Sequence, residues 1–529
     1  MTDVTPKTEI NKADARPART VAMMMAIMVI GKAMGLMRES MQAMTFGGDT
    51  PYAVAFVQAS SLPNSFLDIM FAAALSSSFI PVFSTYLETK GKRAAFDLAS
   101  LFISITLVLT AAVAVISIIF ATPLYYLVFV VGRETAPSME TRLLAIELLR
   151  YMFPLMILSG LAFSFTGILQ SLGEFRLPAA MSVVSNGAIL LYYFLFVDRF
   201  GVRGLAVAFL MGWAMQALIQ VPWLYKHRFR FRFRINLRDS GLRQIGALAL
   251  PVMVASWVLS VNYLVNLSAA SGLYGGDFGA PAIRYAHTLF VIVSGVFVLS
   301  VSNVIFPKLS RQVANKDSEG FKSSLQETVR VMFFFLLPLT FGMMALNQPL
   351  VQLLFGRGEF CERAVEITAT ALFFFSAGTV GYGLQVMLSR ACFAQKDGRT
   401  PLVAAVVAIG VNGVLSFALL RLEIAGPALA GAIGITLGAA VMAIALTYKG
   451  LLTWPAGLVA DIIKMALLAV LMFFAVKFTL THLRDSSAFL QVLVPAAVGV
   501  VLYFSGCWLL QMKEIAWIKQ NLRGNRDDK

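Results

Sequence analysis

Stretches of about 20 apolar residues recur from one end of this chain to the other, and they constrain its fold more than any other feature. Each stretch is long enough to cross the roughly 30 Å hydrocarbon core of a bilayer. The chain is 58% hydrophobic and only 13% charged, which is far more apolar than a soluble domain. We therefore predict an all-α polytopic membrane protein.

The apolar stretches predict about fourteen spanning helices. They are expected near residues 20–45, 53–83, 96–120, 144–172, 178–197, 201–225, 243–270, 281–307, 326–347, 364–394, 400–421, 425–448, 455–480 and 487–512. The count changes by one if the apolar stretch Pro349–Phe355 re-enters the membrane. No cleavage site follows the first hydrophobic run, so no removable signal peptide is expected.

The net charge of +15 is distributed unevenly between the two sides of the predicted membrane protein. Basic residues gather in loops after even-numbered helices, at 90–93, 226–243 and 308–322, whereas the opposite loops carry single arginines such as Arg133. This positive-inside pattern places both termini in the cytoplasm. In the loop KHRFRFRFRINLR the arginines alternate with aromatic residues, which favours contact with anionic lipid headgroups rather than nucleic acid.

Two halves of the chain resemble each other at an offset of roughly 225 residues. Residues 77–90 match 302–316, 172–187 match 394–413, and 201–212 match 424–438. In the second match Asn186 stands opposite Asn412. Three matches in the same order indicate two copies of a six-helix bundle. Both copies start from the same side, and substrate sites of such transporters lie between the repeats near the midplane of the bilayer.

The predicted organisation is therefore two pseudo-symmetric six-helix lobes followed by two further helices. The segments are a cytoplasmic tail 1–19, an N-terminal lobe 20–225, a basic cytoplasmic loop 226–242, a C-terminal lobe 243–448, the two last helices 455–512, and a cytoplasmic tail 513–529.

Several ionisable residues fall inside predicted spans, where each costs roughly 2.5–3.5 kcal/mol on insertion scales. The first helix holds Lys32, Arg38 and Glu39, the second holds Asp68, and the eighth holds Arg284 with His287. Because such residues face protein or water rather than lipid, they predict a mainly cationic cavity for an anionic cargo.

Simpler roles remain open for each of these residues. Lys32 with Glu39, or Arg38 with Asp68, can form an ion pair that only fixes helix packing. Arg284 lies near the outer end of its helix and can extend to the surface. His287 can be a hydrogen-bonded interior residue rather than a proton relay.

Enzyme chemistry finds no support in the sequence. No glycine-rich phosphate loop with Lys-Ser/Thr, no His/Glu metal pair and no GxSxG elbow is present. The cysteines at 361, 392 and 507 lack metal-ligand spacing. We expect a transporter that is not an enzyme.

Six motifs give the chain a specific resemblance. They are GKAMGLMRES at 31–40, SLPNSF at 61–66, FIPVFSTY at 79–86, VSGVFVLSVSNVIFPKLSR at 293–311, LLFGRGEF at 353–360 and FAQKDGRTP at 393–401. Together they resemble the MurJ/MviN family of the multidrug/oligosaccharidyl-lipid/polysaccharide flippase superfamily. The resemblance implies flipping of lipid II, the peptidoglycan precursor, to the outer leaflet of the bacterial plasma membrane by alternating access. It also implies that helices 13 and 14 form a groove for the polyprenyl tail.

The family's charged residues carry over only in part. Its first-helix arginine corresponds to Lys32, and its pair of an arginine and an acid corresponds to Arg38–Glu39. An arginine after the LPN of helix 2 falls on Leu67, next to Asp68, and a helix-8 arginine falls near Thr288, one turn after Arg284. An aspartate of the first two helices has no clear counterpart, although Asp49 is nearby.

The resemblance also bears on the driving force. A sodium site of some relatives suggests Asn262 and Asn412 as sodium candidates, without a carboxylate beside them. No cofactor is expected beyond a sodium ion or the membrane potential as a source of energy. We expect a monomer whose partners are lipid II, or a related polyprenyl-diphosphate lipid, and anionic membrane lipids.

Three other functions stay open on the sequence alone. An exporter of another polyprenyl-diphosphate-linked oligosaccharide would need the same cationic cavity. A drug/cation antiporter of the same superfamily would need an acidic, aromatic-lined cavity, which Lys32 and Arg38 oppose. A membrane scaffold without transport activity would tolerate removal of these charges.

Overall fold

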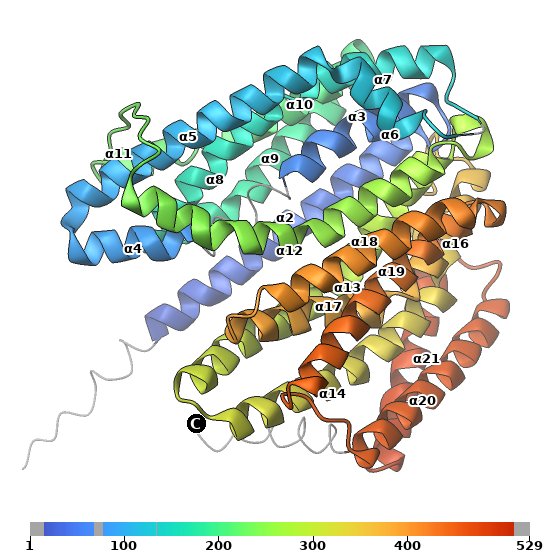
Figure 1. Cartoon of the computed structure of the whole chain (residues 1–529). Helices are drawn as coiled ribbons and strands as arrows, with labels where there is room; N and C mark the ends of the chain where they lie inside the picture. Colours follow the sequence, from blue (N-terminus) through green and yellow to red (C-terminus); the bar gives the residue numbers. More distant parts are fainter. Residues whose placement is uncertain (1–14, 68–77, 134, 513–529) are drawn as a thin grey trace, which may run out of the picture. The chain divides into compact units, whose positions relative to one another are not determined.

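A computed structural model describes residues 15–67, 78–133 and 135–512, and this part of the chain is helical throughout, with connecting turns and no strand (Figure 1). The all-α prediction is confirmed. Asp68, residues 1–14 of the predicted N-terminal tail and all of the C-terminal tail 513–529 lie outside the described residues.

Helices follow one another with short connections in both halves of the chain. The first half contains α2 (Ala15–Phe46), α3 (Pro51–Leu67), α4 (Ile80–Thr89), α5 (Gly91–Ile119), α6 (Ala121–Phe129), α7 (Met139–Met152), α8 (Leu155–Ser171), α9 (Arg176–Leu195), α10 (Val197–Leu218) and α11 (Val221–Lys226). The second half contains α12 (Ser240–Ala270), η3 (Tyr274–Gly276), α13 (Gly279–Ala314), α14 (Ser318–Ala345), α15 (Asn347–Leu354), α16 (Glu362–Ser376), α17 (Thr379–Ala394), α18 (Arg399–Ala418), η4 (Leu420–Leu422), α19 (Ala425–Tyr448), α20 (Ala456–Thr481) and α21 (Ala488–Leu509).

The described residues do not show all of the fourteen predicted membrane spans. Within the described residues ten helices are long and apolar enough to cross a membrane, or eleven if α16 and α17, which meet at a 48° bend, form one span. The predicted spans near 20–45, 53–83 and 243–270 are not among them. Helix α2 covers the first of these stretches and carries five charged residues, α3 is described only as far as Leu67, and a shorter apolar helix within the third stretch covers Val258–Ala270. The count of fourteen is therefore not confirmed.

Proline and glycine interrupt several of the helices. Pro154 stands at the junction of α7 and α8, because a proline removes a helix hydrogen bond and cannot continue the preceding turn. Gly201 has φ 53° inside α10, where the path of the helix breaks. The helices on either side of Pro154 still form one candidate span, Met139–Ser171.

The chain divides into two compact units that do not follow the order of the sequence. The first unit comprises residues up to Gln42, Leu62–Leu124 and Ile146–Met253. The second comprises Ala43–Ser61, Tyr125–Ala145 and the chain from Val254 onward. Two short segments from the first half of the sequence thus belong to the same unit as helices α13–α21.

Each unit has its own apolar core. In the first unit, side chains of α5 and α8 pack with the stretch around Phe79 and Phe83. In the second unit, α20 and α21 lie side by side, and α20 packs along α14 (Figure 1). The buried Tyr503 of α21 donates a hydrogen bond of 2.9 Å to the carbonyl oxygen of Phe334 in α14. Within the second unit, the last two helices are therefore held against α14 by both apolar packing and a buried hydrogen bond.

The basic loop of residues 226–238 lies along α5. Arg234 forms an ion pair with Asp97 at 3.1 Å, and its backbone N–H donates to the hydroxyl of Ser104. The aromatic residues Phe231 and Phe233 are 44% and 61% exposed. The loop thus presents cations and apolar rings together at the surface, the composition that favours a lipid interface.

Candidate substrate site

Arg38 and Glu39 form a partly buried ion pair in α2 of the first unit. The guanidinium of Arg38 donates to a carboxylate oxygen of Glu39 over 2.7 Å, with the two side chains 22% and 5% exposed. Its other terminal nitrogen donates to the amide oxygen of Asn186 over 3.1 Å, and its Cζ lies 5.0 Å from the ring centroid of Phe209. Three helices therefore position this one arginine.

Small residues of α2 allow α9 to approach closely enough for this arrangement. A Cβ placed at Gly31 would lie 3.1 Å from Ser182, and one at Gly35 would lie 3.4 Å from the amide nitrogen of Asn186. The Asn186 amide donates to the carbonyl oxygen of Gly31 and to the hydroxyl of Ser182, both over 3.2 Å. Asn186 is thereby fixed, with its amide oxygen directed at Arg38.

The same turn of α2 holds buried polar atoms with no hydrogen-bond partner among the described residues. They are the Nε of Arg38 and both side-chain polar atoms of Gln42, a residue with no exposed surface. Buried polar groups in native proteins are normally paired, and an exception calls for a ligand, water or functional explanation. This turn therefore offers donors and an acceptor that the folded chain leaves available.

Lys32 lies nearer the N-terminal end of α2 and is exposed. In the described part of the chain it has no ion pair, because Glu39 is bonded to Arg38 instead. The predicted alternative of a Lys32–Glu39 pair is not what the structure shows. The α2 site therefore combines one engaged cation, one free cation and one carboxylate, with a formal net charge of +1 from these three residues.

Arg284 of α13 is buried inside the second unit, with 8% of its surface exposed. It donates a hydrogen bond of 3.0 Å to the hydroxyl of Ser60 in α3. The hydroxyl of Thr288 donates to the backbone carbonyl oxygen of Arg284 one turn earlier in α13. In this structure Arg284 points into the protein and does not extend to its surface.

His287 lies among aromatic rings rather than beside an acid. Its ring centroid is 4.7 Å from that of Tyr263 and 5.8 Å from that of Phe375. Nothing in the described residues connects it to a chain of carboxylates. The environment fits an interior packing residue of α13.

Asn262 and Asn412, the sodium candidates, contact each other in the second unit. The amide of Asn412 donates to the side-chain oxygen of Asn262 over 2.9 Å, and Ser416 donates to the amide oxygens of Asn412 and Asn266. Each of these amide oxygens already accepts a hydrogen bond, and the cluster contains no carboxylate to offset a cation. No group of three His, Cys, Asp or Glu side chains that could hold a metal occurs in the described residues. This donor set is a poor fit for sodium.

The contact of Asn412 repeats the contact of Asn186. Asn186 in α9 bonds the carbonyl oxygen of Gly31 in α2, and Asn412 in α18 bonds the carbonyl oxygen of Asn262 in α12. These are matching positions of the internal repeat, each bonded to the first helix of its half. The sequence aligned the two asparagines but gave no sign that one of them would orient Arg38.

The glycine-containing turns after α2 and α15 pack against each other in the second unit. The N–H of Glu359 donates to the carbonyl oxygen of Met44 over 2.9 Å. Gly47 and Gly358 both have positive φ, and a Cβ at Gly358 would lie 2.4 Å from the Met44 oxygen. Glycine is needed here for both the backbone conformation and the close approach.

The predicted site residues thus fall into two groups. Lys32, Arg38 and Glu39 belong to the first unit, whereas Arg284, His287 and Thr288 belong to the second. Asp68 is outside the described residues. Sequence reasoning missed Asn186, Phe209 and Gln42, because none is ionisable. Only the repeat pointed to Asn186.

A family model described as lipid II flippase MurJ matches residues 43–498 of this chain. A protein of Burkholderia cenocepacia described as lipid II flippase MurJ is 26% identical over 499 residues, covering 92% of this chain and 96% of that protein. A structure described as lipid II flippase MurJ in an inward closed conformation superposes with a TM-score of 0.77 at 22% identity, covering 93% of this chain and 99% of that one. An inward-facing multidrug resistance MATE family transporter of the MOP superfamily gives 0.68 at 17% identity, covering 81% and 98%.

Proposed function

The chain belongs to the lipid II flippase MurJ family, and from that membership we propose that it moves lipid II from the inner to the outer leaflet of the bacterial plasma membrane by alternating access. The observation that carries the proposal is the family match over residues 43–498. The apolar helices make it a multi-pass membrane protein. The likeness to a MATE transporter fits alternating access, the mode in which a binding site opens to one side of the membrane at a time.

The α2 site gives this proposal a chemical basis. Lipid II carries a diphosphate between its lipid tail and its sugars, and guanidinium groups bind phosphate through paired hydrogen bonds. Arg38 is oriented by Asn186 and Glu39, and the exposed Lys32 adds a second cation. A diphosphate reaching Arg38 displaces Glu39 or uses the unpaired Nε. Glu39 then acts as an exchangeable counter-ion that keeps the arginine in place between transport cycles.

We assign the polyprenyl tail of the lipid to the surface of α20 and α21. These helices expose large apolar side chains, including Phe474 at 63%, Phe478 at 68% and Val501 at 68%. An apolar surface of this kind suits a polyprenyl tail that stays in the lipid phase while the polar head crosses. We assign both termini to the cytoplasm on the positive-inside pattern of the loops.

The membrane potential is the proposed driving force. An inside-negative potential favours outward movement of an anion by about 2.3 kcal/mol per charge per 100 mV. The asparagine cluster of Asn262 and Asn412 offers a sodium ion no carboxylate, so we assign no step to sodium. The transport cycle needs no bond to be made or broken, and we propose no enzyme activity.

Complementation tests this function directly. The chain should restore growth to a bacterium depleted of its own lipid II flippase, and the Arg38→Ala variant should fail at equal abundance in the membrane. Failure of a correctly inserted wild-type chain would refute the proposal. Export of a different polyprenyl-diphosphate oligosaccharide is the second candidate, because the α2 cations suit any such diphosphate, and rescue of a strain lacking that exporter alone would favour it.

A further inference from the structure

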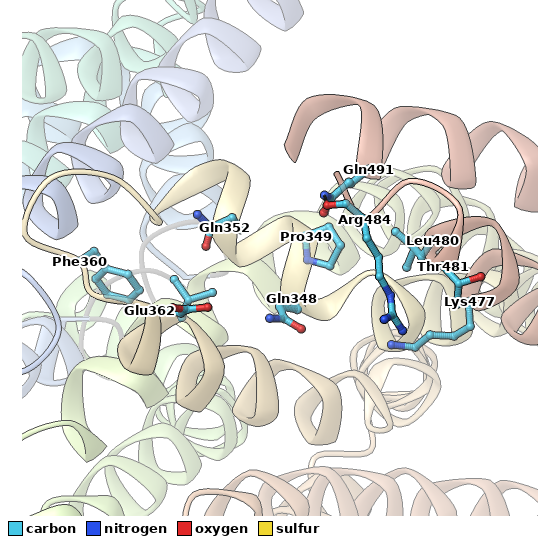
Figure 2. A pocket seen from close by; sticks show the side chains of 11 residues that line it. Gln348, Pro349, Gln352, Phe360, Glu362, Lys477, Leu480, Thr481, Arg484 and Gln491 are labelled. Atoms are coloured by element: carbon cyan, nitrogen blue, oxygen red, sulfur yellow. Dashed lines mark hydrogen bonds between the residues drawn. The ribbon is translucent and has the colours of Figure 1, made fainter. Parts of the chain in front are cut away.

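A polar cavity of about 680 Å³ lies in the second unit, apart from the α2 site and from Arg284. It is bounded by α15, the first turn of α16, the end of α20 and the start of α21 (Figure 2). Because α20 and α21 are spanning helices, the cavity sits where those spans end, at the depth of lipid headgroups. By the positive-inside pattern this is the outer side.

Two cations lie at one end of the cavity. Lys477 is in the last turns of α20 and Arg484 follows the helix; both line the cavity, and Figure 2 shows both side chains on the side of the cavity away from Glu362. Neither has a carboxylate partner in the described residues, whereas Arg330 and Lys464, also in spanning helices, both pair with Asp461. Two cations that line the same end of a cavity attract an anion there.

The opposite end of the cavity carries a carboxylate. Glu362 is the first residue of α16, where a negative charge also suits the positive end of the helix dipole. It has no ion pair among the described residues, and its cationic neighbour Arg363 lies over the ring of Phe278 instead. Figure 2 shows the side chain of Gln348 between Glu362 and the two cations.

The amides of the cavity can bind groups of either polarity. Gln491 donates two hydrogen bonds of 2.9 Å to the backbone oxygens of Arg484 and Ser486, which leaves its own oxygen free to accept. The cavity therefore has a cationic end, a carboxylate end and amides along its walls. Its complement is a zwitterion with a phosphate at one end and a hydrogen-bonding ammonium group at the other.

We propose that this cavity binds the phosphoethanolamine headgroup of a membrane phospholipid, with the phosphate at Lys477 and Arg484 and the ammonium group at Glu362. A lipid is favoured over a soluble zwitterion because apolar side chains adjoin the cavity residues in sequence. Phe489 and Leu490 of α21 come directly before Gln491 and are 57% and 42% exposed. These side chains can contact the acyl chains of a lipid whose headgroup enters the cavity.

Native mass spectrometry of the full-length protein in detergent tests this inference, with lipids of identical acyl chains added one at a time. Phosphatidylethanolamine should bind more tightly than phosphatidylglycerol, which lacks the ammonium group, and than phosphatidylcholine, whose quaternary ammonium cannot donate hydrogen bonds. Equal binding of the three lipids would overturn the proposal. Equally tight binding of soluble phosphoethanolamine would overturn the lipid assignment.

Variants locate the binding within the protein. Lys477→Gln/Arg484→Gln should weaken phosphatidylethanolamine binding by about 10- to 100-fold, since both charged donors to the phosphate are lost. Glu362→Gln should remove the preference for phosphatidylethanolamine over phosphatidylcholine while binding of both lipids continues. The matched control Lys308→Gln/Arg311→Gln removes two exposed charges from α13 outside the cavity and should leave binding unchanged. Unaltered binding in Lys477→Gln/Arg484→Gln, or an equal loss in the control, would contradict the site.

Discussion

At the scale of single residues, the two terminal nitrogens of Arg38 bond different partners, Asn186 and Glu39. Arg38→Ala should abolish complementation, because it removes a phosphate ligand, while the abundance of the protein stays nearly normal. Arg38→Lys should keep only part of the activity, since one ammonium group cannot reproduce the fork that reaches both Asn186 and Glu39. Growth of the depleted strain, with immunoblots for abundance, measures both effects.

Asn186→Ala is the control for positioning at this site. It leaves every charge in place but removes the hydrogen bond of 3.1 Å that orients the guanidinium. We expect activity between those of the wild type and Arg38→Ala. Normal growth of Arg38→Ala would sink the assignment of Arg38 as a substrate ligand.

Arg284 allows a second test at the residue scale. Because it is 8% exposed and bonded to Ser60, Arg284→Ala should impair flipping in vesicles containing the purified protein. Arg284→Ala/Thr288→Arg should recover some activity if a guanidinium is needed one turn along α13. A double variant no better than Arg284→Ala, with thermal stability equal to the wild type, would show that position 288 cannot replace Arg284.

The sequence identified the ionisable members of the candidate site but not their partners. The cost of burying charge makes Arg38 and Glu39 conspicuous in an apolar stretch. Asn186 and Gln42 are uncharged, so burying them in an apolar stretch does not mark them in the sequence. Their surroundings are known only from the structure. The Arg38–Glu39 pair itself joins sequence neighbours, whose side chains normally diverge on a helix, and spacing alone could not predict it.

At the scale of helices, the apolar stretches located each element well but not its breaks. A hydropathy pattern measures composition, whereas breaks depend on local backbone geometry. The 48° bend between α16 and α17 follows Ser376 inside a predicted span, at a position where the sequence has no proline. The all-α class was therefore predictable from the apolar stretches, whereas the bend between α16 and α17 was not.

The short connection between α17 and α18 provides a test of stability. Asp397 accepts hydrogen bonds from the backbone N–H of Thr400 over 3.1 Å and from its hydroxyl over 2.6 Å, and it contacts Lys449 after α19. Burial raises the pKa of Asp397, but these hydrogen bonds outweigh it and lower the pKa to about 2. The ionised carboxylate therefore joins the start of α18 to the end of α19.

Asp397→Asn should lower the stability of the protein by about 1 kcal/mol at neutral pH, since Asn still caps the helix but loses the charge-assisted bonds. Because the folded-state pKa is depressed, the difference from wild type should be full above about pH 4. It should shrink as pH falls towards 2. Thermal unfolding in detergent measures this difference in stability.

The matched control is Asp317→Asn at the start of α14, where the carboxylate caps the helix by accepting from Gly320. This variant should change the stability little. A difference that grows on acidification would contradict the role of the Asp397 charge.

At the scale of the whole molecule, the proposed driving force predicts a response to voltage. For two uncompensated negative charges the potential supplies roughly 4–5 kcal/mol per 100 mV. Collapsing the potential with valinomycin and potassium should therefore slow lipid II flipping in vesicles, whereas removing sodium should not. A rate unaffected by voltage but dependent on sodium would reverse this assignment.

The boundaries between the two compact units fall inside helices rather than in loops. Helix α2 passes from one unit to the other at Gln42, α3 passes at Ser61, and α6, α7 and α12 are divided in the same way. Pro63, which lacks a backbone hydrogen-bond donor, lies two residues from the division of α3. If the units move during transport, these helices must bend. The stiffness of the helices, more than that of the loops, would then set the rate of each conformational change.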